Sequence, residues 1–203
     1  MTGIITGRGD RGLSDTRDHQ RIPKTDPRLE AVGAVDELSC FVGALRVLLD
    51  PASEGVTPSH EASASEATAS VAVALLELQR DLYRLNAELA TVDPSRLGDL
   101  RLLGPGDVRR LEQWTHALEA RVTPPPAFVL PGGGNPASAA ADVCRAVCRR
   151  AERRLAAFFA RQGSADGDTS ALVFLNRCSD YFFVLALSLA TKLDYAVPTP
   201  ARP

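Results

Sequence analysis

The segment 170–193, SALVFLNRCSDYFFVLALSLATKL, constrains the fold of this chain more than any other feature. It has the pattern of a helix that is apolar nearly all round, and such a helix has to be buried by its neighbours. Four earlier segments repeat apolar residues at helical spacing: 26–49, 71–91, 107–122 and 137–161. Convincing strand alternation is absent from the sequence. Five helices with short connections predict an all-α bundle that buries the last helix.

Two proline-containing junctions indicate where helices begin. Asp26 is a predicted N-cap with Pro27 at the first helical position, and Asn135 with Pro136 repeats this arrangement. The stretch TPPPAFVLPGGGNP that leads to Asn135 cannot lie inside a helix or strand, because of its prolines and glycines. We therefore expect a loop that delivers the cap of the helix starting near residue 137.

The 203 residues fit one domain with flanking segments. Residues 1–25 carry glycines and charges with little periodicity, which predicts a loop or flexible arm before a bundle domain at 26–192. Within that domain, 51–70 is rich in Ser, Ala, Glu and Pro and has almost no large apolar residues. It cannot offset the entropy of ordering, so we expect a disordered or loosely held loop. Residues 193–203 are expected to form a C-terminal tail.

Net charge and apolar content narrow the class of protein. The formal charge is -2 and the pI is about 5.9, whereas a general nucleic-acid binder is usually basic throughout. No charge-free apolar run reaches about 18 residues, and MTGIITGRGDRG lacks a signal-peptide core. We expect a cytoplasmic protein that binds neither nucleic acid nor membrane. Four cysteines in apolar helical contexts predict buried free thiols: Cys40, Cys144, Cys148 and Cys178.

The stretch CRAVCRRAERR, residues 144–154, places five arginines in eleven residues. At about 100° per residue, one arc of this helix is apolar, with Arg145, Arg149 and Arg153 as a stripe beside it and Glu152 at the border. The arc consists of Val143, Cys144, Val147, Cys148, Ala151, Leu155 and Phe158. Arg150 and Arg154 lie further round, which predicts solvated side chains.

Several charged groups adjoin apolar surface and therefore need partners. An unpaired charge at the position of Arg145 or Glu152 costs several kcal/mol. Asp36 falls on a predicted apolar stripe of helix 26–49 that runs from Leu29 through Val32 and Gly33 to Cys40 and Gly43. An arginine opposite Asp36, in the same chain or across a subunit contact, would explain it.

A second polar set lies inside the most apolar helix, where Asn176, Arg177 and Asp180 are about one turn apart. Either a ligand site or a buried hydrogen-bond network that fixes helix register accounts for them.

Anion binding is the chemistry that the arginine stripe favours. Guanidinium groups offer planar forked donors to phosphates or carboxylates, so three on one face could clamp a polyphosphate. The arm TGRGDRGLSDT, followed by Lys24, adds glycines that let backbone N–H groups approach an anion. A floppy tail is the alternative for the arm. LPGGG before a helix is equally well explained by a plain turn.

Six motifs occur together and in order: TGRGDRGLSDT, RIPKTDPRLEAVGAVDELSCFVG, LQRDLYRLNAELA, FVLPGGG, CRAVCRRAERR and FLNRCSDYFFVLA. Together they closely resemble the PduO-type ATP:cob(I)alamin adenosyltransferases, over most of the chain outside 51–70 and the C-terminal tail. The resemblance implies a five-helix bundle assembled as a homotrimer, with an active site at each subunit interface. It also implies that Asp36 of one subunit pairs with Arg145 of its neighbour, with Asp180 as a further structural residue of this region.

The resemblance further implies that cob(I)alamin attacks the 5' carbon of ATP, releasing triphosphate and forming adenosylcobalamin. Mg2+ would assist, although no metal ligand is assigned. Arg145, Arg149 and Phe128 would have catalytic roles, Phe128 near the lower face of the corrin. Implied ATP-binding residues are Thr6, Gly7, Arg8, Gly9, Ser14, Asp15, Lys24, Arg149, Arg150, Glu152, Arg153 and Asn176. A cobalamin reductase and an adenosylcobalamin-dependent enzyme are implied partners.

Three residues depart from the family pattern. Gly7 stands where lysine is usual and Arg8 where threonine is common, so a positive charge is displaced by one residue. Asp142 replaces a common histidine and adds a negative charge beside the arginine stripe. Gly7 and Asp142 favour an alternative, a catalytically weak trimeric carrier of ATP or adenosylcobalamin. A helical module whose arginines bind an acidic protein is the third hypothesis.

Overall fold

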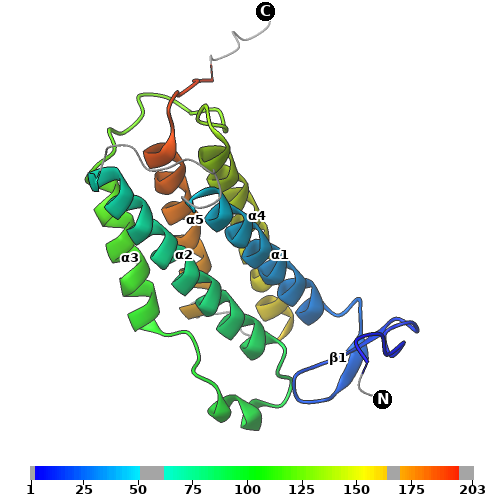
Figure 1. Cartoon of the computed structure of the whole chain (residues 1–203). Helices are drawn as coiled ribbons and strands as arrows, with labels where there is room; N and C mark the ends of the chain where they lie inside the picture. Colours follow the sequence, from blue (N-terminus) through cyan, green and yellow to red (C-terminus); the bar gives the residue numbers. More distant parts are fainter. Residues whose placement is uncertain (1–2, 51–61, 164–169, 197–203) are drawn as a thin grey trace, which may run out of the picture.

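Five long helices form the body of the protein (Figure 1). The computed structural model describes residues 3–50, 62–163 and 170–196. The helices are α1 (Pro27–Leu48), α2 (Ala62–Leu89), α3 (Pro105–Glu119), α4 (Pro136–Arg161) and α5 (Ser170–Leu189). A short 3-10 helix, η2 (Pro94–Asp99), and two three-residue strands, β1 (Leu13–Asp15) and β2 (Arg21–Pro23), complete the described elements. The predicted helical bundle is confirmed, with the addition of a small antiparallel hairpin.

The helices pack in the order α2, α1, α4, α5, α3, so that α4 lies between α1 and α5. All five contribute to a single hydrophobic core, which contains Leu38, Leu82, Leu111, Leu155 and Phe174. By contrast, α2 and α3 have little close backbone contact among the described residues. Long charged side chains join these two helices instead, including an ion pair between Arg110 and Asp81.

The last helix is buried on one side rather than all round. Phe174, Cys178, Phe182 and Leu185 are buried, whereas Asp180 is exposed. Of the described helices, α5 alone has the length and apolar composition needed to cross a bilayer, and half of its residues are buried within the protein. The expectation of complete burial was wrong because the polar residues of this helix share one face.

The predicted apolar stripe of α1 was also wrong. Gly33, Asp36 and Cys40 are exposed. The buried stripe consists of Ala31, Ala34, Val35, Leu38, Val42 and Leu45. It offers larger side chains at spacings of three and four, so its burial removes more apolar area from water. Cys40 is therefore not a buried thiol, whereas the other three cysteines are buried as predicted.

The helix caps and the apolar arc of α4 agree with the sequence. Asp26 accepts a hydrogen bond from the backbone N–H of Arg28 at 2.8 Å, and Asn135 accepts one from that of Ser138 at 2.9 Å. Every member of the predicted arc is buried except Val143, which is 41% exposed. The start of α2 differs, because the helix begins at Ala62, inside the stretch where a loop was expected. The remainder of that stretch, 51–61, lies outside the described residues.

The turn between the two strands, residues 16–20, is fixed to the bundle by Asp18. Its carboxylate accepts hydrogen bonds from the hydroxyl of Thr16 and from the backbone N–H groups of Val92 at 3.1 Å and Asp93 at 2.8 Å. These bonds, above all the one from Thr16, lower the pKa of Asp18 below its ordinary value. A carboxyl whose pKa is lowered by folding stabilises the fold above its unfolded pKa and loses this effect only as pH falls through the folded value.

Arg28 strengthens the same corner of the molecule. Its Nη1 donates to the carbonyl oxygens of Leu89 at 2.6 Å and Thr91 at 2.9 Å, where α2 ends. Cationic groups are favourable at helix C-termini, where carbonyl oxygens lack partners. The guanidinium carbon also lies 4.8 Å from the ring centroid of Phe158 on α4. One side chain therefore joins α1, α2 and α4 beside the hairpin.

We predict that Asp18→Ala releases the 16–20 turn without unfolding the helices, because its four acceptor contacts are all local to this corner. Tryptic cleavage at Arg17 and Arg21 should accelerate on the order of tenfold, since proteolysis follows the population of the open form. The measurement is limited proteolysis with mass spectrometry, alongside circular dichroism. Asp10→Ala, in the exposed part of the arm, is the matched control. Equal cleavage rates in wild type and Asp18→Ala would show that the carboxylate does not hold the turn.

Candidate functional site

A groove of about 550 Å³ runs between α4 and α5. From α4 it is lined by Arg149, Glu152, Arg153 and Ala156, and from α5 by Leu172, Val173, Asn176 and Arg177. The α4 residues follow helical spacing on the side of the helix that faces α5. Three guanidinium groups and one carboxylate give this groove a positive character, so it suits an anionic ligand.

Hydrogen bonds across the groove hold part of this set in place. Asn176 Nδ2 donates to Glu152 Oε1 at 3.1 Å, and Arg177 Nη1 donates to Asn176 Oδ1 at 2.8 Å. Arg177 Nε continues the chain by donating to Glu112 Oε1 of α3 at 2.9 Å. Asn176 and Arg177 thus take part in a hydrogen-bond network, but these residues are half-buried and Asp180 is exposed, so the network is not the buried one that was one of the two alternatives. The network orients Glu152 and Asn176 toward each other.

Arg149 differs from its neighbours because its guanidinium is exposed and makes no hydrogen bond or ion pair with any residue that the structure describes. Arg153 uses Nη1 to donate to the carbonyl oxygen of Arg149 at 2.9 Å. Since that bond occupies one of five guanidinium N–H donors, Arg153 also keeps donors for a ligand. These two arginines are the groove's available cationic groups.

A second, smaller groove of about 330 Å³ lies between α3 and α5 and shares Arg177 with the first. Asp180 lines it, together with His116 and Phe183. Burial, the largest effect, raises the pKa of Asp180, and the nearby Arg177, at 3.9 Å, opposes this. The sequence did not predict this smaller groove.

It also did not predict that Leu172 and Val173 line the α4–α5 groove. These two residues lie four and three positions before Asn176, and this helical spacing could have indicated them.

The arm forms a separate cluster of candidate residues around the hairpin. Arg8 contacts Asp15 through two atoms, Nη2 to Oδ1 at 3.0 Å and Nε to Oδ2 at 3.0 Å. Arg21 Nη2 donates to the carbonyl oxygen of Arg8 at 2.6 Å. A side-chain carbon at Gly9 would lie 3.1 Å from Lys24 Nζ, so this glycine lets the lysine approach the backbone closely.

The remaining arm residues lie along the same loop and strand. Thr6 Oγ1 accepts from Arg8 N at 3.4 Å, and Gly7 has a φ of +65°, which favours glycine. Ser14 is half-buried in β1, opposite Ile22 of β2. The structure thus brings the predicted arm residues together: Thr6, Gly7, Arg8, Gly9, Ser14, Asp15 and Lys24.

The arm cluster and the α4–α5 groove are not joined within one chain. No hydrogen bond or ion pair among the described residues links an arm residue to Arg149, Glu152, Arg153 or Asn176. The arm instead contacts the region where α2 ends, through Asp18 and Arg17. The two predicted halves of the anion site are therefore separate in a single subunit.

Arg150 and Arg154 lie on the other side of α4 and face α1. Arg150 forms an ion pair with Glu37, and Arg154 Nε lies 3.7 Å from Glu30 Oε2. Both are exposed, as predicted, but they are paired rather than merely solvated. Arg150 therefore does not join the groove residues with which the resemblance grouped it.

Asp36 and Arg145 are not paired in the chain. Arg145 Nε is buried, lies 3.5 Å from Asp142 Oδ1 and has no hydrogen-bond acceptor among the described residues. Asp142 itself accepts a hydrogen bond from the backbone N–H of Gly132 at 2.9 Å. Asp36 makes no hydrogen bond or ion pair with any residue that the structure describes and lies on the exposed side of α1. Of the two alternatives for its arginine partner, the one within the same chain is therefore absent from the described residues, and the partner across a subunit contact stays a prediction.

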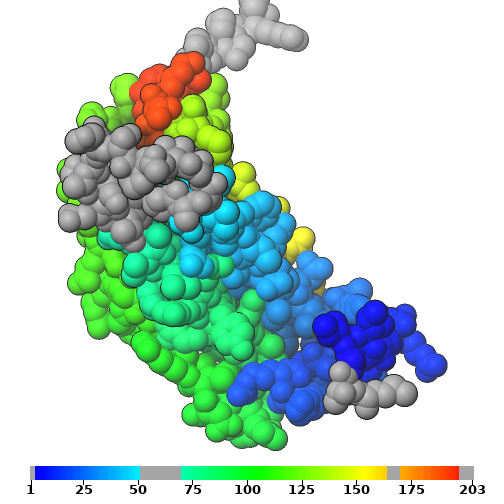
Figure 2. All heavy atoms as spheres, in the orientation of Figure 1, coloured from blue at the N-terminus to red at the C-terminus, as the bar shows by residue number. Residues whose placement is uncertain are grey.

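The loop before α4 presents Phe128, whose side chain is 87% exposed. The backbone around it is fixed: Ala196 N donates to Phe128 O at 2.8 Å and Leu130 N to Asp194 O at 2.7 Å. Figure 1 places this loop and the arm at opposite ends of the bundle, and Figure 2 shows the arm residues, in blue, at the lower right of the molecule. A helix of the length of α4 spans roughly 39 Å, so Phe128 and the arm of one chain cannot share a small ligand.

Known proteins resemble this chain over most of its length. The family model described as cobalamin adenosyltransferase matches residues 4–189. The human corrinoid adenosyltransferase MMAB is 38% identical over 192 residues, covering 93% of this chain and 69% of the human protein. A cobalamin adenosyltransferase from Cupriavidus metallidurans is 34% identical over 92% of this chain and 87% of its own length.

Solved structures of one relative agree with the fold. A variant PduO-type ATP:corrinoid adenosyltransferase from Lactobacillus reuteri, complexed with cobalamin and ATP, is 30% identical with a TM-score of 0.69, covering 92% of each chain. A second variant of that protein, complexed with ATP, gives a TM-score of 0.70 at 28% identity, over 91% of this chain and 92% of that one. The matches in sequence and in fold show that the chain belongs to the cobalamin adenosyltransferase family.

Proposed function

We propose that this protein transfers the 5'-deoxyadenosyl group of ATP to the cobalt of cob(I)alamin. The Co(I) electron pair forms the new bond to C5', the bond from C5' to oxygen breaks, and triphosphate leaves with the electron pair of that broken bond. The observation that carries the proposal is the exposed, unpaired guanidinium of Arg149 beside Arg153 in the α4–α5 groove, in a chain of this family. Arginines on a leaving triphosphate position C5' and stabilise the charge that develops on it.

The remaining substrate contacts fall to the two clusters. In the arm, Lys24 and the backbone around Gly7 and Gly9 bind triphosphate, while Arg8, Ser14 and Asp15 shape the loop. In the groove, Glu152 and Asn176 orient the nucleotide. Phe128 contacts the lower face of the corrin, and Arg145 acts at the subunit contact. Mg2+ arrives on ATP, since this ion is usually held by substrate phosphates with one or two carboxylates, and Glu152 is the carboxylate available in the groove.

A homotrimer completes the site by placing the arm of one subunit against the α4–α5 groove of the next. Three features support this assembly. The two clusters are separate in one chain, Arg145 Nε is buried without an acceptor among the described residues, and Asp36 is exposed on α1. Phe41 and Leu48, seven residues apart on α1, and Val143 of α4 are exposed as well, and a subunit contact would remove this apolar surface from water. Asp36 pairs with Arg145 of the neighbouring subunit.

The enzyme works in the cytoplasm, receiving reduced corrinoid from a cobalamin reductase and passing its product to an adenosylcobalamin-dependent enzyme. A second candidate function, a trimeric carrier with weak turnover, is favoured by one observation. Asp15 neutralises Arg8, the displaced positive charge of the arm, through two contacts near 3.0 Å. Less positive charge then remains for the leaving triphosphate.

We predict that anaerobic cob(I)alamin with MgATP and this protein converts to adenosylcobalamin, measured by absorbance. Arg149→Ala should weaken ATP binding roughly 10- to 100-fold, as expected for loss of charge-assisted hydrogen bonds, and Arg149→Lys should restore only part of it. Arg161→Ala, at the exposed end of α4, is the control. Retained ATP binding without conversion in the wild type would favour the carrier instead.

We predict that Asp36→Ala weakens assembly while each subunit stays folded, because Asp36 is exposed and has no partner among the described residues of its own chain. Sedimentation velocity over a concentration series should then show dissociation at concentrations where wild type is intact. Asp99→Ala removes an exposed carboxylate of η2 and serves as the control. An intact, active Asp36→Ala trimer at all concentrations would contradict the proposed pairing.

A further inference from the structure

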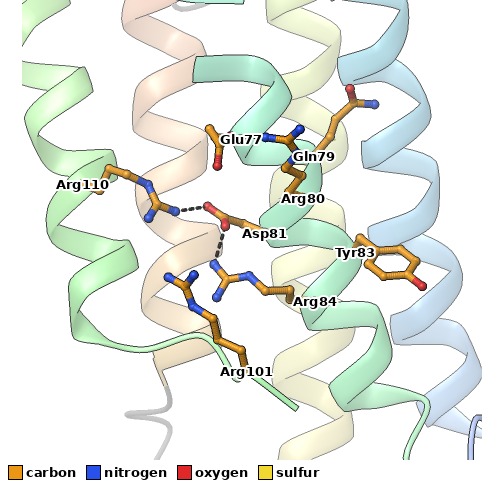
Figure 3. A pocket seen from close by; sticks show the side chains of 8 residues that line it. All are labelled: Glu77, Gln79, Arg80, Asp81, Tyr83, Arg84, Arg101 and Arg110. Carbon is orange, nitrogen blue, oxygen red and sulfur yellow. Dashed lines mark hydrogen bonds and ion pairs between the residues drawn. The ribbon is translucent and has the colours of Figure 1, made fainter. Parts of the chain in front are cut away.

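A pocket of about 490 Å³ lies beside α2, toward α3, and none of the residues that line it belongs to the α4–α5 groove. Figure 3 shows four arginines on its walls, Arg80 and Arg84 from α2, Arg101 from the η2–α3 connection and Arg110 from α3. The guanidinium groups of Arg84 and Arg110 both contact Asp81. In a chain with net charge -2, this concentration of arginine requires an explanation.

Two buried carboxylates account for two of the arginines. Asp81 accepts hydrogen bonds from Arg84 and Arg110. Asp107 accepts from Arg84 Nη2 at 2.8 Å and lies 3.1 Å from Arg110 Nη1. Buried carboxylates without such partners would cost several kcal/mol each. Asp81, Asp107, Arg84 and Arg110 therefore form a network with no net charge, and these four residues are enough to join α2 to α3.

Arg101 and Arg80 are not required to neutralise Asp81 and Asp107. The side chain of Arg101 is 77% exposed and reaches Asp107 only at 3.6 Å, and that of Arg80 is 63% exposed and pairs with Glu77 at the surface. Exposed pairs of this kind contribute little to stability. Arg84 Nη1 and Arg110 Nε are buried and have no acceptor among the described residues, so the donors that a ligand can reach belong chiefly to Arg80 and Arg101. The four arginines face three carboxylates, those of Glu77, Asp81 and Asp107, and the cluster therefore carries one uncompensated positive charge.

We propose that this pocket binds a small multivalent oxyanion of the phosphate class, at a site separate from the ATP groove. Arg101 and Arg80 at the mouth close on the anion and supply its positive charge, while Arg84 and Arg110 are held in place by Asp81 and Asp107. Guanidinium forks match the geometry of phosphate oxygens. Free phosphate and polyphosphate share this chemistry.

The single tryptophan of the chain provides a reporter of binding. The Arg110 guanidinium carbon lies 5.4 Å from the ring centroid of Trp114, so an anion that draws on Arg110 changes the surroundings of the indole. Titration of the full chain with inorganic tripolyphosphate, and separately with inorganic phosphate, should change Trp114 fluorescence saturably. Tripolyphosphate should bind more tightly because it offers more charge. No corrinoid is present, so the result does not depend on transferase activity.

The matched variants locate the site. Arg80→Gln/Arg101→Gln should weaken tripolyphosphate binding at least about tenfold, measured by fluorescence and by calorimetry. Arg96→Gln/Arg109→Gln removes the same charge from exposed positions outside the pocket and should leave affinity within about twofold. Arg149→Ala should lose ATP affinity but retain the Trp114 signal.

Three outcomes would overturn the proposal. Equal affinity in wild type and Arg80→Gln/Arg101→Gln would remove these side chains from any anion site. Loss of the tripolyphosphate signal in Arg149→Ala would assign the binding to the α4–α5 groove. Binding of polyglutamate in place of tripolyphosphate would identify an acidic-protein surface rather than a phosphate site.

Discussion

The packing of α4 against both α1 and α5 governs the arrangement of the rest of the molecule. The arc of α4 in this contact contains three small side chains, those of Cys144, Cys148 and Ala151, all of which are buried. Small residues let neighbouring helices approach, and α5 fills the space with Phe174 and Phe182. With both flanks of the arc occupied, the arginines of α4 are divided between two sides. Arg149 and Arg153 face the α5 groove, and Arg150 and Arg154 face carboxylates of α1.

The arginines between residues 149 and 154 of α4 therefore have two uses, ion pairing between helices on one side and availability to a ligand on the other. Toward α1, each arginine has a carboxylate and serves the contact between helices. Toward α5, Glu152 accepts a hydrogen bond from Asn176 and forms no ion pair with Arg149 or Arg153, so the arginines there remain available. On the α2–α3 side, Asp81 and Asp107 engage Arg84 and Arg110, whereas Arg80 and Arg101 make only exposed contacts with carboxylates. The number of carboxylates near an arginine cluster therefore indicates, better than the number of arginines, how many guanidinium groups are free to bind a ligand.

The sequence predicted the features that depend on local rules and missed those that depend on long-range contacts. The caps at Asp26 and Asn135 and the arc of α4 follow from neighbouring residues, and they are present. The two strands have three residues each, too few for an alternating pattern to be recognised. The stripe on α1 was misplaced because small residues such as Gly33 fit either face equally well. The pairing of Arg8 with Asp15 was missed, because it requires the hairpin that brings the two together. The groove residues Arg149, Glu152, Arg153 and Asn176 are brought to one place, whereas Arg150 is not.

The loop that carries Phe128 is confined by its glycines. A side-chain carbon at Gly133, where φ is +58°, would lie 1.9 Å from Ser138 Oγ, and one at Gly134 would lie 2.8 Å from Thr191 Oγ1. Neither position tolerates another residue without displacing the start of α4 or the segment after α5. The turn next to α4 therefore depends on glycine at these two positions. The exposed side chain of Phe128, in contrast, can be exchanged without moving that turn, so a change in what this end of the bundle recognises is accommodated there at lower cost.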